Sequence, residues 1–219
     1  MNDSSDVAGI SYISEVKRKL VHLSSLWIPG VMVLLTEYRW WLCAMFGVVF
    51  AATVLVERWY ARWPDAWISR IYGHFFGRMV RGGTPAPNQW IVSGGPYVLA
   101  GAFLVLLCFP VALAACGMTV MLIGDTAAAL IGRRFGRHKT VNGKSLEGVA
   151  AFILSGSLAC VVCSWLLAMP ARIGWFIPVA VTFAAIAELF EKQLRIDDNI
   201  SIPLVTAGVL YTAEMLILV

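Results

Sequence analysis

The chain has 219 residues, of which 59% are hydrophobic and only 14% are charged, and its mean hydropathy is +0.77. Soluble domains carry about 25% charged residues, so this composition excludes an ordinary soluble domain and indicates a membrane protein with several crossings. The formal net charge of +4 is small, and its distribution along the chain is more informative than its size.

Long apolar runs predict an all-α, polytopic integral membrane protein with about seven transmembrane helices plus one interfacial amphipathic helix. A polar tail over residues 1–14 comes first, and no short apolar region with a cleavage site follows it, so we expect no cleavable signal peptide. The predicted spans cover residues 20–36, 39–56, 90–108, 110–131, 148–169, 173–190 and 202–218. Only Pro110 separates the third span from the fourth. The runs predict one integral membrane domain over residues 1–219.

The segment 65–81 differs from the spans because apolar and basic residues alternate along it. Its apolar residues Trp67, Ile71, Phe75 and Val80 recur at nearly helical spacing, with arginines between them. This pattern predicts an amphipathic helix in the membrane interface, and the alternative is a plain cytoplasmic loop helix.

The positive charges fall almost entirely on one side of the predicted spans. With the N-terminus inside, all 17 Lys and Arg residues except Arg39 and Arg172 lie on the inner side. Because basic residues prefer cytoplasmic loops, we expect the N-terminus in the cytoplasm and the C-terminus on the opposite side.

The first polar feature on the inner side lies where the first span begins. Arg18, Lys19 and His22 follow Glu15, and Arg18 and His22 are four residues apart on one helix face. A basic anchor for anionic lipid headgroups is one interpretation. His22 is less simply explained, since an ionisable group inside an apolar run usually faces the protein interior.

The second feature lies at the end of the fourth span, where Asp125 comes before a basic loop. A carboxylate at that depth is costly unless it is paired or bound to a cation, so Asp125 is either a salt-bridge partner of the loop or a Mg²⁺ ligand, and we favour the metal. The nitrogen donors of the loop suit phosphate oxygens. They belong to Arg133, Arg134, Arg137, Lys139 and Lys144. Ser145 then opens the next helix, whose N-terminal amides favour anions.

The third feature is the polar stretch between the last two spans, with Glu188 and Glu191 before it. Asp197, Asp198 and Asn199 form a second candidate cation or hydroxyl site. The alternative is a polar turn that ends at Pro203. Because the loops after the fourth and sixth spans reach the same side, we predict that Asp198 and Asn199 lie close to Asp125.

Three blocks of this sequence resemble the dolichol kinase, phytol kinase and CTP-dependent diacylglycerol kinase group, within the wider CTP-using membrane family that includes phosphatidate cytidylyltransferase. The blocks are Glu15-x-x-Arg18-Lys19-x-x-His22, Gly124-Asp125 through Lys144-Ser145-x-Glu147-Gly148, and Asp198-Asn199 with Pro203. The last block looks like the kinase branch, and the chain lacks the Pro-Gly-His-Gly-Gly run of the cytidylyltransferases.

The resemblance implies transfer of the γ-phosphoryl group of CTP, with Mg²⁺ as cofactor, to the hydroxyl of a membrane lipid alcohol of the polyprenol, phytol or diacylglycerol type. It makes Asp125, Asp198 and Lys144 the candidate catalytic residues, with Asp125 and Asp198 as metal ligands. The candidate nucleotide-binding residues are Arg18, Lys19, His22, Arg133, Arg137, Lys139, Ser145, Glu147 and Asn199.

Two other functions remain open from the sequence. A phosphatidate cytidylyltransferase-like enzyme would use the same basic loop to make a CDP-lipid. A non-enzymatic transporter or scaffold is the other alternative, although transporters often show inverted repeats, and we find none here. CTP, a lipid alcohol and the bilayer are the expected partners, and no nucleic acid is expected.

Overall fold

The computed structural model describes residues 12–63, 65–67, 69–70 and 93–218, and this part of the chain is helical. The α-helices are α1 (Tyr12–Ser24), α2 (Trp27–Leu34), α3 (Arg39–Arg62), α5 (Gly94–Cys108), α6 (Val111–Phe135), α7 (Leu146–Leu166), α8 (Ile177–Leu189), α9 (Glu191–Leu194) and α10 (Asp198–Leu218). The 3-10 helices η2 (Val141–Gly143) and η3 (Ala171–Phe176) also belong to the described part of the chain. The predicted amphipathic segment 65–81 falls mostly outside the described residues.

Five helical segments of the described part are long and apolar enough to cross a membrane: Arg39–Arg62, Val111–Phe135, Leu146–Leu166, Ala171–Leu189 and Asp198–Leu216. The shorter apolar helix α5 has 15 residues. The all-helical architecture of an integral membrane protein is therefore confirmed for the described residues, while the number of crossings stays a prediction.

The predicted span 20–36 is divided between α1 and α2. Pro29 has no N–H group to donate to the carbonyl of Ser25, which accepts a bond from Ile28 N at 2.9 Å instead. The break between α1 and α2 falls at Ser25 and Leu26, and Pro29 lies in the first turn of α2, where its missing N–H group is tolerated. The break at Pro110 between α5 and α6 is confirmed, because Pro110 is the N-cap residue of α6.

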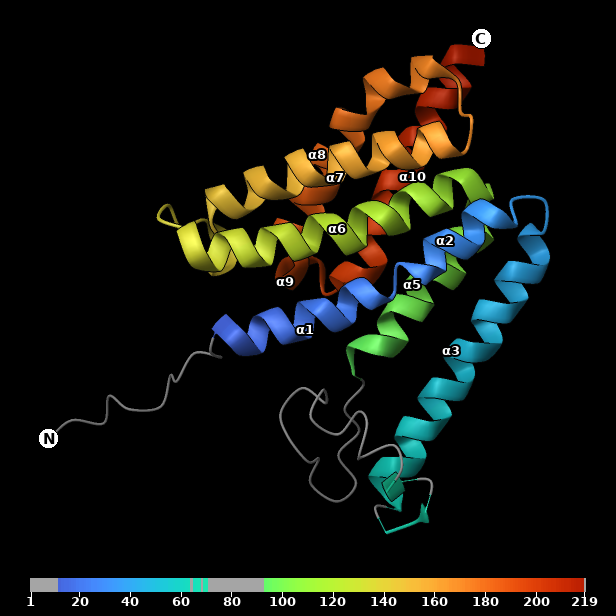
Figure 1. Cartoon of the computed structure of the whole chain (residues 1–219), viewed down its shortest axis with the longest axis vertical. Coiled ribbons are helices and arrows are strands. Elements are labelled where there is room, and N and C mark those ends of the chain that lie inside the picture. The colour runs from blue at the N-terminus through green and yellow to red at the C-terminus, as the bar shows by residue number, and fades with distance from the viewer. Residues whose placement is uncertain (1–11, 64, 68, 71–92, 219) are drawn as a thin grey trace, which may run out of the picture.

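The central element of the bundle is α6, which lies between α7 on one side and α1 and α2 on the other, with α10 packed against it as well (Figure 1). Small residues permit this crowding, as is usual for helices packed in membranes. A Cβ atom at Gly117 would come within 2.5 Å of the Pro203 carbonyl oxygen of α10. At Gly132 it would approach Gly148 Cα of α7 at 3.4 Å.

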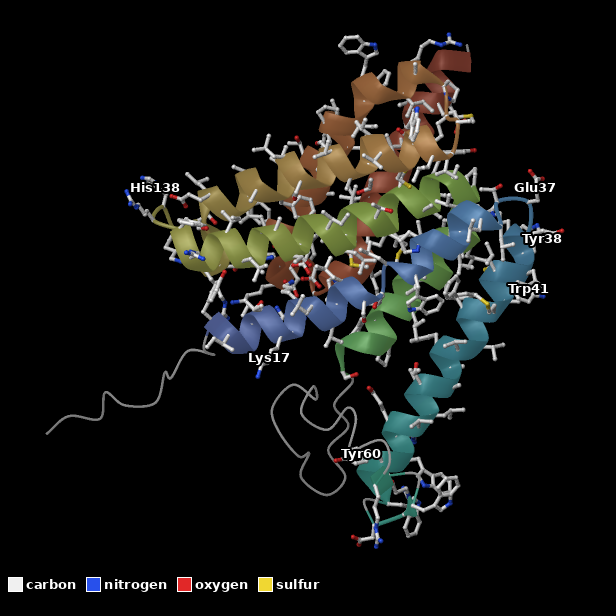
Figure 2. The ribbon with its side chains drawn as sticks, in the orientation of Figure 1. Lys17, Glu37, Tyr38, Trp41, Tyr60 and His138 are labelled. Atoms are coloured by element: carbon white, nitrogen blue, oxygen red, sulfur yellow. The ribbon has the colours of Figure 1, made fainter. Side chains whose placement is uncertain are left out.

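The two ends of the bundle differ in chemistry. Figure 2 shows His138, beyond the end of α6, far from Glu37, Tyr38 and Trp41 at the opposite end of the bundle. Near the latter end, Trp41 is exposed, and Arg39 donates to the carbonyl oxygens of Leu106 and Leu107 at 2.9 and 3.0 Å. Exposed tryptophans at helix ends are typical of a membrane interface. The polar residues of interest gather at the other end.

Candidate functional site

A polar cavity of about 320 Å³ lies at the end of the bundle that carries the loop between α6 and α7. Its lining comes from α1, α6, this loop, α7, α8, α9 and α10. The cationic side chains that line it are Arg18, Lys19, Arg133, Lys139 and Lys144. The acidic side chains are Asp125, Glu188, Glu191 and Asp198. Segments far apart in the sequence thus bring both signs of charge to one cavity.

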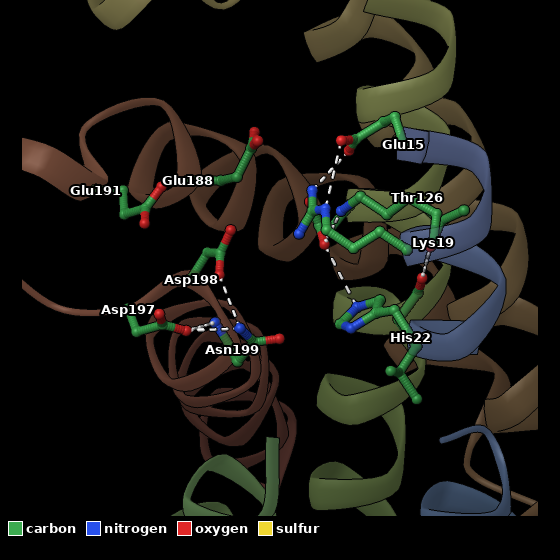
Figure 3. A network of polar contacts seen from close by, with 12 residues as sticks. Glu15, Lys19, His22, Thr126, Glu188, Glu191, Asp197, Asp198 and Asn199 are labelled. Atoms are coloured by element: carbon green, nitrogen blue, oxygen red, sulfur yellow. Dashed lines mark hydrogen bonds and ion pairs between the residues drawn. The ribbon is translucent and has the colours of Figure 1, made fainter. Parts of the chain in front are cut away.

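The Asp125 carboxylate is held by α1. Lys19 Nζ donates to Asp125 Oδ2 at 2.5 Å, and His22 Nε2 lies 3.4 Å from the same oxygen (Figure 3). Lys19 and Asp125 are 2% and 7% exposed. A buried carboxylate needs such compensation, because removing it from water is expensive. The salt-bridge interpretation from the sequence placed the partner in the basic loop, whereas these partners come from α1.

Glu15 connects α1 with the last turn of α6. It accepts from Arg18 Nη2 at 2.6 Å, and Arg133 Nη2 lies 3.5 Å from its other oxygen. Glu15 is buried, while the Arg18 and Arg133 side chains are 49% and 39% exposed. The two arginines are therefore anchored at a buried carboxylate, while much of each side chain is exposed.

Lys144 lies in another part of the cavity lining, where its side chain contacts the C-terminal end of α8. Its Nζ donates to Glu188 Oε1 at 2.8 Å and to the Glu188 carbonyl oxygen at 2.5 Å. Glu191 Oε2 lies 3.6 Å away. Burial alone would lower the pKa of Lys144, but the carboxylates of Glu188, Glu191 and Asp198 outweigh it and raise this pKa above its ordinary value. Lys144 is therefore a stable cation in the cavity.

Three carboxylates form an acidic cluster beside Lys144. One oxygen each from Glu191, Asp197 and Asp198 lies within 4.8 Å of the others. Asn199 Nδ2 donates to Asp197 Oδ1 at 2.6 Å and to Asp198 Oδ1 at 3.0 Å (Figure 3). Asp198 and Asn199 belong to the first turn of α10, and Pro203 lies inside this helix, so the stretch is not a turn that ends at the proline.

The loop between α6 and α7 is held in a hairpin-like shape. Lys139 and Ser145 form an antiparallel bridge, and Thr140 N donates to the Lys144 carbonyl oxygen at 2.7 Å. Ser145 Oγ accepts from Gly148 N at 3.1 Å, which makes Ser145 the N-cap of α7. Lys139, Lys144 and the α7 N-terminus consequently lie at the same cavity, where backbone N–H groups favour an anion.

The structure brings most of the predicted site residues to this cavity. Asp198 lines it together with Asp125, as the alternation of sides predicts. The other predicted residues in its lining are Lys144, Arg18, Lys19, Arg133, Lys139 and Ser145.

Four predicted residues are not part of the cavity lining. His22 and Asn199 contact residues that line the cavity. Glu147 instead pairs with the exposed His138 at 2.7 Å, and Arg137 lies in the loop. The sequence places Glu188 and Glu191 beside the second candidate site and assigns neither of them a role, although a glutamate at the end of an apolar run is the signal that marks both positions.

Comparisons with known proteins show which proteins this chain is similar to. The chain is 29% identical over 194 residues to an uncharacterised protein of Rickettsia prowazekii, covering 87% of this chain and 90% of the relative. It is 30% identical over 160 residues to the CTP-dependent diacylglycerol kinase 1 of Schizosaccharomyces pombe, covering 68% of this chain and 70% of that protein. A shorter match of 95 residues, at 38% identity, joins 41% of this chain to 16% of dolichol kinase EVAN of Arabidopsis thaliana.

No family model matches the chain, and no solved structure gives a significant match. One of these two kinases is named for diacylglycerol and the other for dolichol. The similarity therefore supports the kinase group as a whole and no single subgroup. On the extent of the match to the Schizosaccharomyces pombe protein, the chain belongs to the family of lipid kinases that includes this CTP-dependent diacylglycerol kinase.

Proposed function

We propose that this protein is a CTP-dependent kinase that transfers the γ-phosphoryl group to the hydroxyl of a membrane lipid alcohol. The observation that carries the proposal is the cavity that presents five cationic and four acidic side chains at one end of an apolar helical bundle. Phosphoryl transfer depends on positioning and on neutralising the phosphate charge, and both kinds of side chain serve that purpose. CTP as donor is supported by the name of the Schizosaccharomyces pombe relative.

The basic residues are proposed to bind the triphosphate. Arg18 and Arg133 each reach Glu15, their side chains are 49% and 39% exposed, and a planar guanidinium group suits bidentate phosphate contacts. Lys139 and Lys144 approach the cavity from the loop, next to the capped N-terminus of α7. Arg137 is exposed in the same loop and is absent from the cavity lining, so any contact that it makes with the nucleotide would be less direct.

The acidic cluster fits a magnesium ion. Carboxylate oxygens are the donors that Mg²⁺ prefers, and one or two carboxylates together with substrate phosphates commonly hold it. Asp198 is the proposed principal ligand because it belongs to the cluster and lines the cavity, with Glu191 and Asp197 beside it. Asp125 is the proposed second ligand. Bound Mg²⁺ would neutralise charge on the transferred phosphoryl group.

The reaction itself can be tested with purified protein, CTP labelled in the α- or γ-phosphate, and a panel of polyprenol, phytol and diacylglycerol. Labelled lipid phosphate from γ-labelled CTP, together with CDP, is the expected result, with ATP as the control donor. A CDP-lipid and pyrophosphate would identify a cytidylyltransferase instead. If no lipid in the panel gives either product, both enzymatic assignments are overturned.

Removal of divalent cations is expected to abolish the transfer, and added Mg²⁺ should restore it. The reason is that the acidic side chains of the cavity otherwise repel the triphosphate. The measurement is the initial rate in EDTA and after Mg²⁺ is returned, with the protein's monodispersity in detergent as the control. Full activity in EDTA would rule out the magnesium assignment.

Replacing Lys144 with alanine is expected to lower kcat/KM for CTP by about 10- to 100-fold, since a charge-assisted hydrogen bond contributes about 1.5–3 kcal/mol. Arg137→Ala is the matched control from the same loop, and its effect should be smaller because Arg137 does not line the cavity. Steady-state kinetics with varied CTP measure both. Unchanged CTP kinetics in Lys144→Ala would mean that Lys144 makes no contact with the nucleotide and that its charge only balances Glu188 and the membrane topology.

A further inference from the structure

Glu188 is a buried carboxylate at the end of the apolar helix α8. It is 5% exposed, and it lines the polar cavity. An ionised carboxylate at such a position is strongly destabilising unless cations and hydrogen bonds compensate it. Its compensation comes from Lys144, which lies 44 residues earlier in the chain and reaches it from the loop between α6 and α7.

The Lys144 ammonium group donates two hydrogen bonds to Glu188 and none to Glu191. An ammonium group has three N–H donors. Two of them go to Glu188, one to the carboxylate at 2.8 Å and one to the backbone carbonyl at 2.5 Å. Glu191, at 3.6 Å, is an ion-pair partner beyond hydrogen-bonding distance. Glu188 thereby fixes the position of Nζ and leaves the third donor for another acceptor.

The loop that carries Lys144 has a second, separate attachment to the same corner. Asn142 Nδ2 donates to the Leu189 carbonyl oxygen at 2.8 Å and to Gln193 Oε1 at 2.7 Å. Neither Asn142 nor Gln193 lines the cavity. The attachment of the loop and the placement of the ammonium group can therefore be perturbed independently.

We propose that Glu188 is a positioning residue, which holds the Lys144 ammonium group at the cavity so that its third N–H donor points to a nucleotide phosphate. The identity of the phosphate rests on the proposed function. Glu188 acts through Lys144 and needs no contact with the substrate itself. The negative charge and the backbone carbonyl of one residue together define the lysine's place.

The test compares Glu188→Gln and Glu188→Ala, each alone and combined with Lys144→Ala. Glu188→Ala should lower kcat/KM for CTP by about 10- to 100-fold, the range for one charge-assisted contact. Glu188→Gln keeps an acceptor of the same length and should retain more activity than the alanine variant. In the Lys144→Ala background either change should cost less than about twofold, because residues that act through one another are non-additive.

Gln193→Ala is the matched control, because it weakens the Asn142 attachment and leaves Glu188 in place. Its kcat/KM should stay within about twofold of wild type. A loss in Gln193→Ala equal to that in Glu188→Ala would mean that only general loosening of the loop matters, which overturns the proposal. A full loss on changing Glu188 in the Lys144→Ala background would also overturn it, since Glu188 would then act by itself.

A readout that needs no turnover separates this inference from the kinase proposal. The rate at which acetic anhydride acylates Lys144, measured by peptide mass spectrometry, should rise several-fold in Glu188→Gln and stay unchanged in Gln193→Ala. Unchanged acylation of Lys144 in Glu188→Gln would overturn the positioning role. If wild-type protein transfers no phosphoryl group from CTP, the proposed function fails, and the acylation rates still decide whether Glu188 holds Lys144.

Discussion

Replacing Asp125 with asparagine is expected to lower turnover by more than about 100-fold while the protein stays folded and inserted in the membrane. The substitution keeps the side-chain shape and removes the charge that Lys19 and His22 both face. It therefore removes a proposed magnesium ligand and also weakens the contact that holds the Lys19 ammonium group, because the asparagine oxygen still accepts a hydrogen bond but carries no charge. The measurement is the single-turnover rate at several Mg²⁺ concentrations.

The neighbouring Thr126 offers a matched control for this position on α6. Thr126 is buried, and its hydroxyl donates to the Leu122 carbonyl oxygen at 2.7 Å within the same helix. Thr126→Val should leave the rate nearly unchanged, because Thr126 does not line the cavity. Near-normal activity of Asp125→Asn at ordinary Mg²⁺ would contradict its assignment as a metal ligand.

Asp198→Asn is expected to have a comparable effect, a loss of more than about 100-fold at ordinary Mg²⁺, with partial recovery when Mg²⁺ is raised. Asp198 combines membership of the acidic cluster with a position in the cavity lining. Losing one charged ligand weakens metal affinity, and higher metal concentration compensates for weak binding by mass action. A titration of the rate with Mg²⁺ measures the change.

Asp197→Asn is the comparison variant from the same cluster. Asp197 accepts from the Asn199 backbone N–H at 3.0 Å and from its Nδ2 at 2.6 Å, and it does not line the cavity. We expect a smaller loss and a smaller shift in the Mg²⁺ requirement than for Asp198→Asn. Equal losses in both variants, with no change in the Mg²⁺ requirement, would argue against a metal site at this cluster.

Hydropathy located the long helices, but several of their ends differ from the predicted bounds. The expected span 110–131 extends to Phe135, which carries Arg133 into the last turn of α6 and up to Glu15. The expected span 202–218 begins earlier, at Asp198, so the acidic cluster is part of a helix. Polar residues at a helix end lower the local hydropathy without ending the helix, and a window of apolar residues therefore stops too early.

The sequence by itself determined the class of protein and the side of the bundle on which the charges gather. Apolar runs and the uneven placement of Lys and Arg carry that information, because each reports how a residue behaves toward water and lipid. This was enough to predict that Asp198 lies close to Asp125, and the structure places both residues in the lining of one cavity.

Only the tertiary structure decided which charges pair. Lys19 and Asp125 are 106 residues apart, and Lys144 binds a glutamate of α8 instead of remaining an unpaired loop cation. These pairs depend on how each helix is rotated about its axis and how closely it approaches α6. That approach is set by small residues such as Gly117 and Gly132, which meet α10 and α7. The spacing of apolar residues along one sequence shows which face of each helix is buried, but it does not show which other helix packs against that face.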